Sequence, residues 1–337
     1  MKLVSFITKN KEERAGIFDR GQVFDLSESA RAIGANLPRT IDLFLQGEER
    51  FMEIAHKVEV AIKANKIDPF TDLLHLIAPV PHPPSCRDGY AFRQHVATAR
   101  RNRGVEMIPE FDQYPVFYFT NHNSIIGEGD VVVESDHLRK LDFELEAAIV
   151  IGKRGKNIDA KDADSYVAGY TIMNDISARV LQMEEMKLNL GPAKGKDFAT
   201  AIGPWLVTSD ELQSKRIATP VGDKCNLRMT ARHNGKQISD GNLGDMNWTF
   251  AELIERASYG VELCPGEVIG SGTVGTGCYL ELNGTWALEA KSRGESFKEI
   301  WLQAGDTIEL EIEGLGVLRN RIVKSPVERS ILAKKKN

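Results

Sequence analysis

Long hydrophobic runs are absent from the sequence. The longest clean apolar runs, such as residues 147–151, are far shorter than the roughly 20 apolar residues that a membrane-spanning helix needs. Near the amino terminus, charged residues from Lys9 onward interrupt the apolar stretch at 3–8, too early for the apolar core of a signal peptide, which takes about 7–15 residues. We therefore expect a cytoplasmic protein with no membrane partner.

Cysteine is scarce, and neither sign of charge is in large excess. The four cysteines, Cys86, Cys225, Cys264 and Cys278, include no CxxC pair, which argues against a zinc site and against a disulfide framework. The net charge of −5 provides no positive field that would attract phosphates, so we expect no nucleic-acid partner. With 42% hydrophobic and 27% charged residues the composition is that of a globular protein, and a small molecule becomes the expected partner.

Prolines mark the expected boundary between two domains. Five prolines fall within residues 69–84, and proline both fixes φ and removes a backbone donor. The sequence predicts a small α+β domain over residues 1–75, made of short strands and an amphipathic helix at about 40–64, followed by a larger domain over residues 76–330.

The larger predicted domain is rich in strand patterns. Apolar and polar residues alternate at 131–133, 143–151, 227–233, 279–282 and 308–312. Asn234-Gly235 between two such runs predicts a type I′ hairpin. Helical patterns such as 248–257 are few, so we expect a mainly β fold with some α (α+β), a roll or sandwich and not a doubly wound parallel sheet.

Three glycines imitate a dinucleotide-binding motif. Gly270, Gly272 and Gly275 fit GxGxxG, but that motif binds a dinucleotide only when a strand precedes it and a helix follows. Because residues 279–282 have a strand pattern, the sequence predicts no dinucleotide site.

The segment Asp142-Phe-Glu-Leu-Glu146 is the strongest local signal. On a strand, Glu144 and Glu146 point to the same face. Burying two like charges side by side is costly unless a cation lies between them. The alternative is a solvent-facing edge of a strand, where charged residues are common.

Two further segments carry candidate functional groups. Asp175 follows the apolar stretch at 170–173, at an expected strand end. Asp88 and His95 are seven residues apart, which on a helix would place them on one face, although a lone histidine is also common as a structural residue. Oxygen ligands without cysteine suit Mg²⁺, Ca²⁺ or Mn²⁺ better than zinc.

These segments together resemble the fumarylacetoacetate hydrolase family. The matching pieces follow the family's order at 88–95, 141–146, 174–182, 191–198, 271–273 and 277–281. The resemblance implies a mixed β-roll catalytic domain behind a small SH3-like amino-terminal domain, a homodimer, and a bound Mg²⁺, with Ca²⁺ or Mn²⁺ as alternatives.

The resemblance also assigns roles to individual residues. The implied metal ligands are Asp88, Glu144, Glu146 and Asp175. The implied catalytic residues are His95 as general base, Glu281 as the carboxylate that orients it, and Lys196. The implied substrate-binding residues are Tyr90, Tyr118, Gln182, Thr273 and one of Arg101 or Arg103, whose guanidinium would bind a carboxylate.

The activity that the resemblance implies is metal-dependent hydrolysis of a carbon-carbon bond in a 1,3-diketo acid, first of all fumarylacetoacetate to fumarate and acetoacetate. Family members that hydrolyse acylpyruvates or fumarylpyruvate, or that isomerise or decarboxylate related acids, are alternatives, because a fold does not fix a reaction. Outside this group, a sugar-acid dehydratase and a non-catalytic, metal-stabilised binding module remain open.

Overall fold

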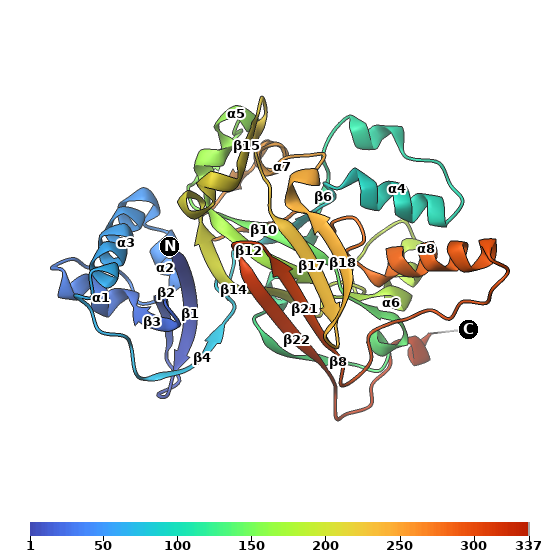
Figure 1. The fold of residues 1–337 in the computed structure, drawn as a ribbon, viewed down its shortest axis with the longest axis horizontal. Helices are drawn as coiled ribbons and strands as arrows, with labels where there is room; N and C mark the ends of the chain where they lie inside the picture. Colours follow the sequence, from blue (N-terminus) through green and yellow to red (C-terminus); the bar gives the residue numbers. More distant parts are fainter. Residues whose placement is uncertain (336–337) are drawn as a thin grey trace.

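The computed structural model describes residues 1–335 and places most strands in two sheets (Figure 1). The larger sheet runs in the order β3 (Gln22–Asp25), β2 (Glu13–Asp19), β1 (Lys2–Thr8), β14 (Thr200–Thr208), β12 (Val167–Asp175), β10 (Leu145–Ile151), β20 (Val268–Gly270), β5 (Cys86–Gly89) and β6 (Phe117–Thr120), with β4 (Leu73–Ile77) beside β1 and β7 (Ile125–Ile126) beside β14. The smaller sheet runs in the order β18 (Lys236–Asn242), β17 (Arg228–His233), β21 (Thr307–Ile312), β22 (Gly316–Lys324) and β8 (Gly129–Val133).

Short strand pairs and helices complete the fold. The pairs are β9 (Leu141–Asp142) with β13 (Ser177–Ala178), β11 (Gly155–Lys156) with β19 (Glu262–Leu263), and β15 (Arg216–Thr219) with β16 (Gly222–Cys225). The α-helices are α1 (Leu26–Ala32), α2 (Ile41–Leu45), α3 (Glu48–Lys63), α4 (Arg93–Asn102), α5 (Ala160–Ala163), α6 (Arg179–Met186), α7 (Phe250–Ser258) and α8 (Tyr279–Ser292). None of these helices combines the length and the apolar character that crossing a membrane requires, within the described residues.

The two sheets share a hydrophobic core. Ile149 of β10 and Ile172 of β12 belong to the same buried cluster as Leu310 of β21 and Leu318 of β22. The other face of the larger sheet packs against the amino-terminal helices, so β10 is buried on both faces and its residues 147–151 are all apolar. The predicted α+β fold built on β-sheets is confirmed, with more helices than the sequence indicated.

The larger sheet crosses the domain boundary expected near residue 75. Strand β1 pairs antiparallel with β14, with Leu3 opposite Leu206, and β4 pairs with β1 as well. The residues on both sides of the expected boundary therefore share backbone hydrogen bonds. The boundary itself and the SH3-like form of residues 1–75 stay predictions.

The predicted helix at about 40–64 is wrong in one respect, because it is two helices. Helix α2 ends at Leu45 and α3 begins at Glu48, which has a left-handed φ of 49°. A side chain at Gly47 would lie within 1.8 Å of the Phe51 ring, and Phe51 also stacks on Phe44 at 6.5 Å. The break therefore lets Phe51 cover a glycine and reach Phe44.

Two predictions about the second part of the chain are also wrong. Residues 279–282 open helix α8 and are not a strand, and Asp88 lies on β5 while His95 lies on α4. The backbone of β5 cannot be helical because it pairs with β20 on one side and with β6 on the other. The predicted hairpin is confirmed, since Asn234 and Gly235 have φ values of 49° and 80° between β17 and β18.

A helix, α8, does follow the GxGxxG glycines, where the sequence predicted a strand. The first two N–H groups of α8, those of Tyr279 and Leu280, donate to the carboxylate of Asp142 at 2.7 and 2.9 Å. This helix end is therefore already occupied by an anion and is not open to a phosphate.

Candidate active site

Four buried carboxylates converge at one place in the larger sheet. One oxygen each of Asp88, Glu144, Glu146 and Asp175 lies within 4.8 Å of the others. Strand order explains the convergence, because Leu145 of β10 pairs with Asn174 of β12, and Gly270 of β20 pairs with both Ala148 and Asp88. These four residues are named the carboxylate cluster below.

The solvent-facing alternative for the glutamates is wrong. Glu146 is fully buried, and Glu144 is only 6% exposed. Glu144 precedes β10 and Glu146 lies on it, so the sheet holds both carboxylates inside the molecule. A cluster of buried acids of this kind needs compensating positive charge.

The electrostatics of the cluster match a cation site. Burial raises the pKa of Asp88, and burial together with the charge of Asp88 raises the pKa of Glu146 well above its usual range. Burial raises the pKa of Asp175 to about 7, and its Oδ1 atom has no hydrogen-bond partner among the described residues. Hard oxygen donors with an unpartnered buried atom fit a divalent cation such as Mg²⁺, Mn²⁺ or Ca²⁺.

Lys196 supplies a fixed positive charge at the edge of the cluster. Its ammonium donates to Glu144 Oε2 and, at 2.5 Å, to Asp175 Oδ2, which also accepts the Tyr118 hydroxyl at 2.5 Å. Burial alone would lower the pKa of Lys196, but the carboxylates of Asp175 and Glu144 raise it above its usual value. Lys196 therefore stays charged.

A histidine–carboxylate dyad lies beside the cluster. Nδ1 of His95 on α4 is 2.6 Å from Oε2 of Glu281 on α8, and both side chains are buried. Oε1 of Glu281 accepts the Thr276 N–H at 3.0 Å. Because an ionised carboxylate only accepts, the Nδ1–H of His95 is the donor of this hydrogen bond, and Nε2 is the nitrogen left for other partners.

Two cations keep Glu144 ionised beside the dyad. Burial would raise the pKa of Glu144, but Lys196 and Arg179 hold it well below its usual range. Asn102 of α4 donates to the carbonyl of Glu281 at 2.9 Å, which fixes the two helices to each other. An imidazole oriented by a carboxylate thus lies next to the carboxylate cluster.

The glycine-rich loop after β20 holds two of the carboxylates. The N–H of Gly272 lies 3.1 Å from both Asp88 Oδ1 and Glu146 Oε2, and the Thr273 hydroxyl donates to Glu146 Oε1 at 3.3 Å. Gly272 has a φ of 78°, and a side chain there would lie 2.6 Å from the carbonyl oxygen of Gly89. Glycine is therefore required where the loop approaches the cluster.

The structure separates the predicted substrate-binding residues into two groups. Tyr118 and Thr273 contact the cluster, and Tyr90 meets the His95 ring edge-on at 6.2 Å. Arg101 and Arg103 are exposed and contact Asn102, Thr285 and the Ala99 carbonyl, so in the described part of the chain neither is hydrogen-bonded to the carboxylate cluster. Their role in binding a substrate stays a prediction.

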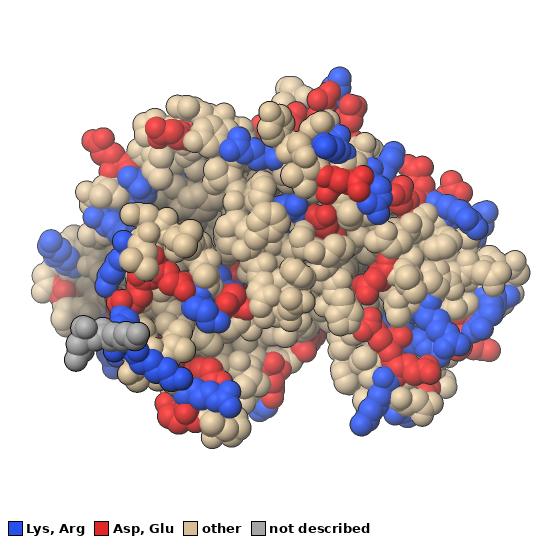
Figure 2. Space-filling model, turned by 180° about the vertical axis from the view of Figure 1, so that it is seen from behind, with Lys and Arg blue, Asp and Glu red and all other residues tan. Residues whose placement is uncertain are grey.

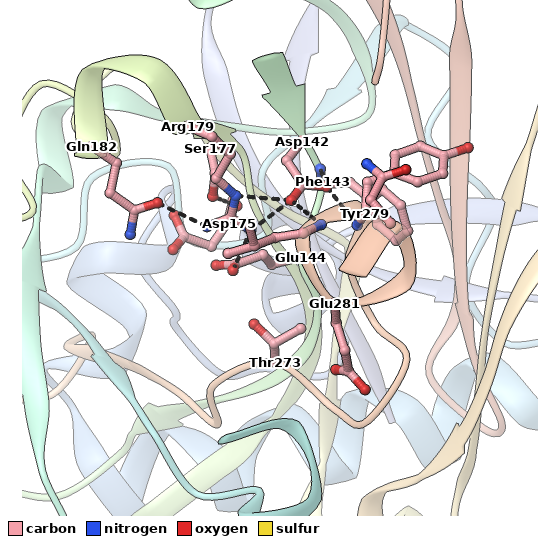
Figure 3. A network of polar contacts seen from close by, with 12 residues as sticks. Asp142, Phe143, Glu144, Asp175, Ser177, Arg179, Gln182, Thr273, Tyr279 and Glu281 are labelled. Carbon is pink, nitrogen blue, oxygen red and sulfur yellow. Dashed lines mark hydrogen bonds and ion pairs between the residues drawn. The ribbon is translucent and has the colours of Figure 1, made fainter. Parts of the chain in front are cut away.

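Sequence reasoning missed two charged residues of the site, Asp142 and Arg179 (Figure 3). The Arg179 guanidinium donates to Asp142 Oδ2 at 2.8 Å, to Glu144 Oε1 at 2.7 Å and to Gln182 Oε1 at 2.9 Å. Both residues stand inside the matching segments 141–146 and 174–182 next to apolar neighbours. A charged residue in such a setting was the signal that could have identified them.

The chain belongs to the fumarylacetoacetate hydrolase family. The family model described as "Fumarylacetoacetate (FAA) hydrolase C-terminal" matches residues 85–323, which contain the carboxylate cluster, Lys196 and the dyad.

Curated relatives are similar over most of the chain. It is 31% identical over 295 residues to "Oxaloacetate tautomerase FAHD2A, mitochondrial" of Homo sapiens, covering 87% of this chain and 82% of that protein. It is 32% identical over 226 residues to "Oxaloacetate tautomerase YisK" of Bacillus subtilis, covering 66% of each.

Solved structures share the fold. A putative HpcE protein from Mycobacterium smegmatis superposes with a TM-score of 0.71 at 24% identity, covering 96% of this chain and 100% of that one. Maleylpyruvate hydrolase from Sphingobium sp. SYK-6, in complex with manganese(II) and pyruvate, superposes with a TM-score of 0.66 at 20% identity, with the same coverage.

Proposed function

We propose that the protein is a metal-dependent enzyme that moves a proton at the carbon next to the carbonyl of a 2-oxo acid, with keto–enol interconversion of oxaloacetate as the first candidate. The observation that carries this proposal is the His95–Glu281 dyad beside four buried carboxylates and Lys196. The relatives named as oxaloacetate tautomerases support the choice of substrate.

His95, Glu281 and Lys196 have different roles in the proposed keto–enol reaction. His95 Nε2 accepts a proton from C3 of the 2-oxo acid, and Glu281 stabilises the imidazolium that forms. The same imidazolium then delivers the proton to the substrate oxygen, which completes the change from keto to enol. Lys196 stabilises the negative charge that the substrate carries between the two transfers.

The carboxylate cluster would contribute to the reaction by binding a metal ion. Asp88, Glu144, Glu146 and Asp175 would hold a divalent cation, which polarises a carbonyl and favours negative charge on its oxygen. Gly272 and Thr273 keep two of these carboxylates in place through neutral donors.

The second candidate is hydrolysis of the carbon-carbon bond of a 1,3-diketo acid, such as fumarylacetoacetate or an acylpyruvate. The oriented dyad favours it, because a histidine held by a carboxylate is suited to taking a proton from water. Both candidates need the same base and the same stabilised enolate, so they differ in whether water attacks.

Parallel assays separate the candidates. The purified protein is given oxaloacetate, fumarylacetoacetate, fumarylpyruvate and acetylpyruvate with Mg²⁺ or Mn²⁺, and again after chelation, while the ultraviolet absorbance of the enol or diketone is followed. We expect metal-dependent acceleration of the oxaloacetate equilibrium. Loss of diketone absorbance alone would favour the hydrolase, and no acceleration with any substrate would contradict both candidates.

A further inference from the structure

Asp142 is a fully buried carboxylate that lies between Arg179 and the start of α8, as Figure 3 shows. Its Oδ1 atom accepts the N–H groups of Phe143 at 2.9 Å and Tyr279 at 2.7 Å. Its Oδ2 atom accepts the N–H of Leu280 at 2.9 Å and Nε of Arg179 at 2.8 Å. Together, the two oxygens therefore accept hydrogen bonds from three separate segments of the chain.

Toward the dyad, Asp142 replaces the missing cap of α8. Cys278 at the N-cap position of α8 makes no side-chain hydrogen bond to the helix. The first N–H groups of a helix need partners, and an anion is favoured there. Glu281 is the third residue of α8, so the position of its carboxylate against His95 depends on where Asp142 holds the first turn.

Toward the carboxylate cluster, Asp142 holds one edge of the Arg179 guanidinium. The other nitrogens of that rigid, planar group donate to Glu144 Oε1 and Gln182 Oε1. A shift of Arg179 would therefore move Glu144 of the carboxylate cluster together with Gln182, a predicted substrate-binding residue.

Capping alone does not require this arrangement. Helix α7 is capped by the neutral side chain of its own Thr249, together with Glu252. A charged carboxylate buried on a distant strand is costly unless it is paired, and Arg179 provides the pair. Capping of α8 therefore does not by itself explain the buried Asp142–Arg179 ion pair, which also contacts the carboxylate cluster through Glu144.

We propose that Asp142 is a positioning residue that couples the carboxylate cluster to the His95–Glu281 dyad, through Arg179 on one side and the first turn of α8 on the other. The inference rests on the proposed function only in giving the dyad its catalytic role. The coupling itself is a property of the folded protein and is measurable without a substrate.

The test compares Asp142→Asn and Arg179→Lys with a matched control, Asp136→Asn. Asp136 is also buried, at 6% exposure, and accepts the N–H groups of Ile331 and Leu332 at 2.7 and 3.1 Å, outside the site. Two readouts are taken on the whole protein. Calorimetric titration gives the affinity for Mn²⁺, and proton NMR of metal-free protein gives the His95 Nδ1–H resonance, assigned by its loss in His95→Ala.

Coupling predicts that each site variant changes both readouts. We expect Mn²⁺ affinity to fall about 10–100-fold, the range typical of residues that hold metal ligands. We expect the Nδ1–H resonance to move or broaden even in Arg179→Lys, which keeps the charge, because the hydrogen bonds of Arg179 within the described residues go to Asp142, Glu144 and Gln182 and not to the dyad. Asp136→Asn should leave both readouts native.

Two results would overturn the inference. One is weaker Mn²⁺ binding in Arg179→Lys with an unchanged Nδ1–H resonance, and the other is a lower melting temperature in Asp142→Asn with both readouts native. If Asp142→Asn fails to fold, Arg179→Lys decides alone. A protein that turns over no 2-oxo acid would contradict the proposed function and leave these two measurements unaffected.

Discussion

The pKa values of two neighbouring carboxylates of the site, Glu144 and Glu146, are shifted in opposite directions by their surroundings. Glu144 accepts from Lys196 and Arg179, and these cations keep its pKa well below the usual range in spite of burial. Glu146 accepts from Gly272 and Thr273, which are neutral, and burial beside Asp88 raises its pKa. Added positive charge is therefore needed most on the Asp88–Glu146 side.

Replacing the base should separate catalysis from metal binding. We expect His95→Ala to lower kcat on the accepted substrate by roughly 10²–10⁴-fold, the usual contribution of a general base, while Mn²⁺ titration stays native. The control is His82→Ala, which removes an exposed histidine that pairs with Glu13 at 3.0 Å. Loss of Mn²⁺ binding in His95→Ala would show that the imidazole is a ligand, and full activity would show that it is not the base.

Replacing a cluster member should give the opposite pattern. Asp175→Ala removes a carboxylate of the cluster and leaves the dyad intact, so metal affinity should fall first and activity should return in part at high metal concentration. Calorimetry with Mn²⁺ measures the affinity directly. Native affinity in this variant would contradict a shared cation site.

Stabilisation by metal should grow with pH. The pKa of Asp175 is raised from its usual value to about 7, mainly by burial, and the pKa of Glu146 is raised as well. In metal-free protein the stability from this raised pKa of Asp175 is present below about pH 4 and is lost as pH rises through about 7. A cation must displace the bound protons at low pH and meets ionised ligands at high pH.

Melting curves with and without Mg²⁺ at pH 5 and pH 8 test this dependence. The increase in Tm caused by metal should be larger at pH 8, because a ligand that binds only the folded protein stabilises it more as its affinity rises. An increase that is equal at both pH values would contradict the raised pKa values.

Residue types indicated much of the site, but not all of it. The spacing of Glu144 and Glu146 was enough to predict that both side chains lie on one face of a strand, because residues two apart on a strand point to the same side. The roles of Asp142 and Arg179 depend on a helix that begins at residue 279, far away in the sequence. Such partners are set by tertiary contacts, which no local pattern contains.

In the loop after β20, Gly272 combines a left-handed φ with a close approach to another backbone segment. Gly272→Ala should cost more than the roughly 1–2 kcal/mol of a left-handed residue, because its side chain would meet the Gly89 carbonyl, and Mn²⁺ affinity should fall. Gly235→Ala in the hairpin has a similar φ of 80° and open space around it. Chemical unfolding and Mn²⁺ titration of both variants give the comparison, and equal effects would contradict a special role for Gly272.

Element predictions succeeded where the signal was local. Asn234-Gly235 specifies a hairpin through its own φ values. Residues 279–282, Tyr-Leu-Glu-Leu, alternate like a strand over four positions, but the carboxylate of Asp142 caps a helix there. The helix expected at 40–64 has a nearly continuous apolar period. The break is seen in the left-handed φ of Glu48 and in the close approach of Phe51 to Gly47, which the apolar period does not contain.

On the face of the molecule in Figure 2, basic and acidic side chains are interspersed, so the surface there offers no extended field of one sign.

Across the whole molecule, the larger sheet connects the amino-terminal strands to the site. The hydrophobic cluster beneath β10 includes Leu3, Phe44 and Leu206, from both sides of residue 75. We expect these parts to unfold together.

Leu3→Ala tests that expectation. Removing this fully buried side chain should cost about 2–5 kcal/mol and lower one common transition. Differential scanning calorimetry measures the number of transitions. Two separate transitions, of which the variant lowers only one, would show that residues 1–75 unfold independently.

The homodimer that the family resemblance implies stays a prediction. Light scattering of the purified protein across concentrations gives the mass in solution. A mass of one chain at all concentrations would contradict it.

Proton exchange at C3 of oxaloacetate reports directly on proton transfer by His95. In D₂O with Mg²⁺, proton NMR follows the loss of the C3 protons. We predict exchange well above the rate in buffer with Mg²⁺ for the native protein, and exchange at the buffer rate for His95→Ala and for protein in excess chelator. Equal acceleration by the native protein and His95→Ala would contradict a metal-assisted proton transfer by His95.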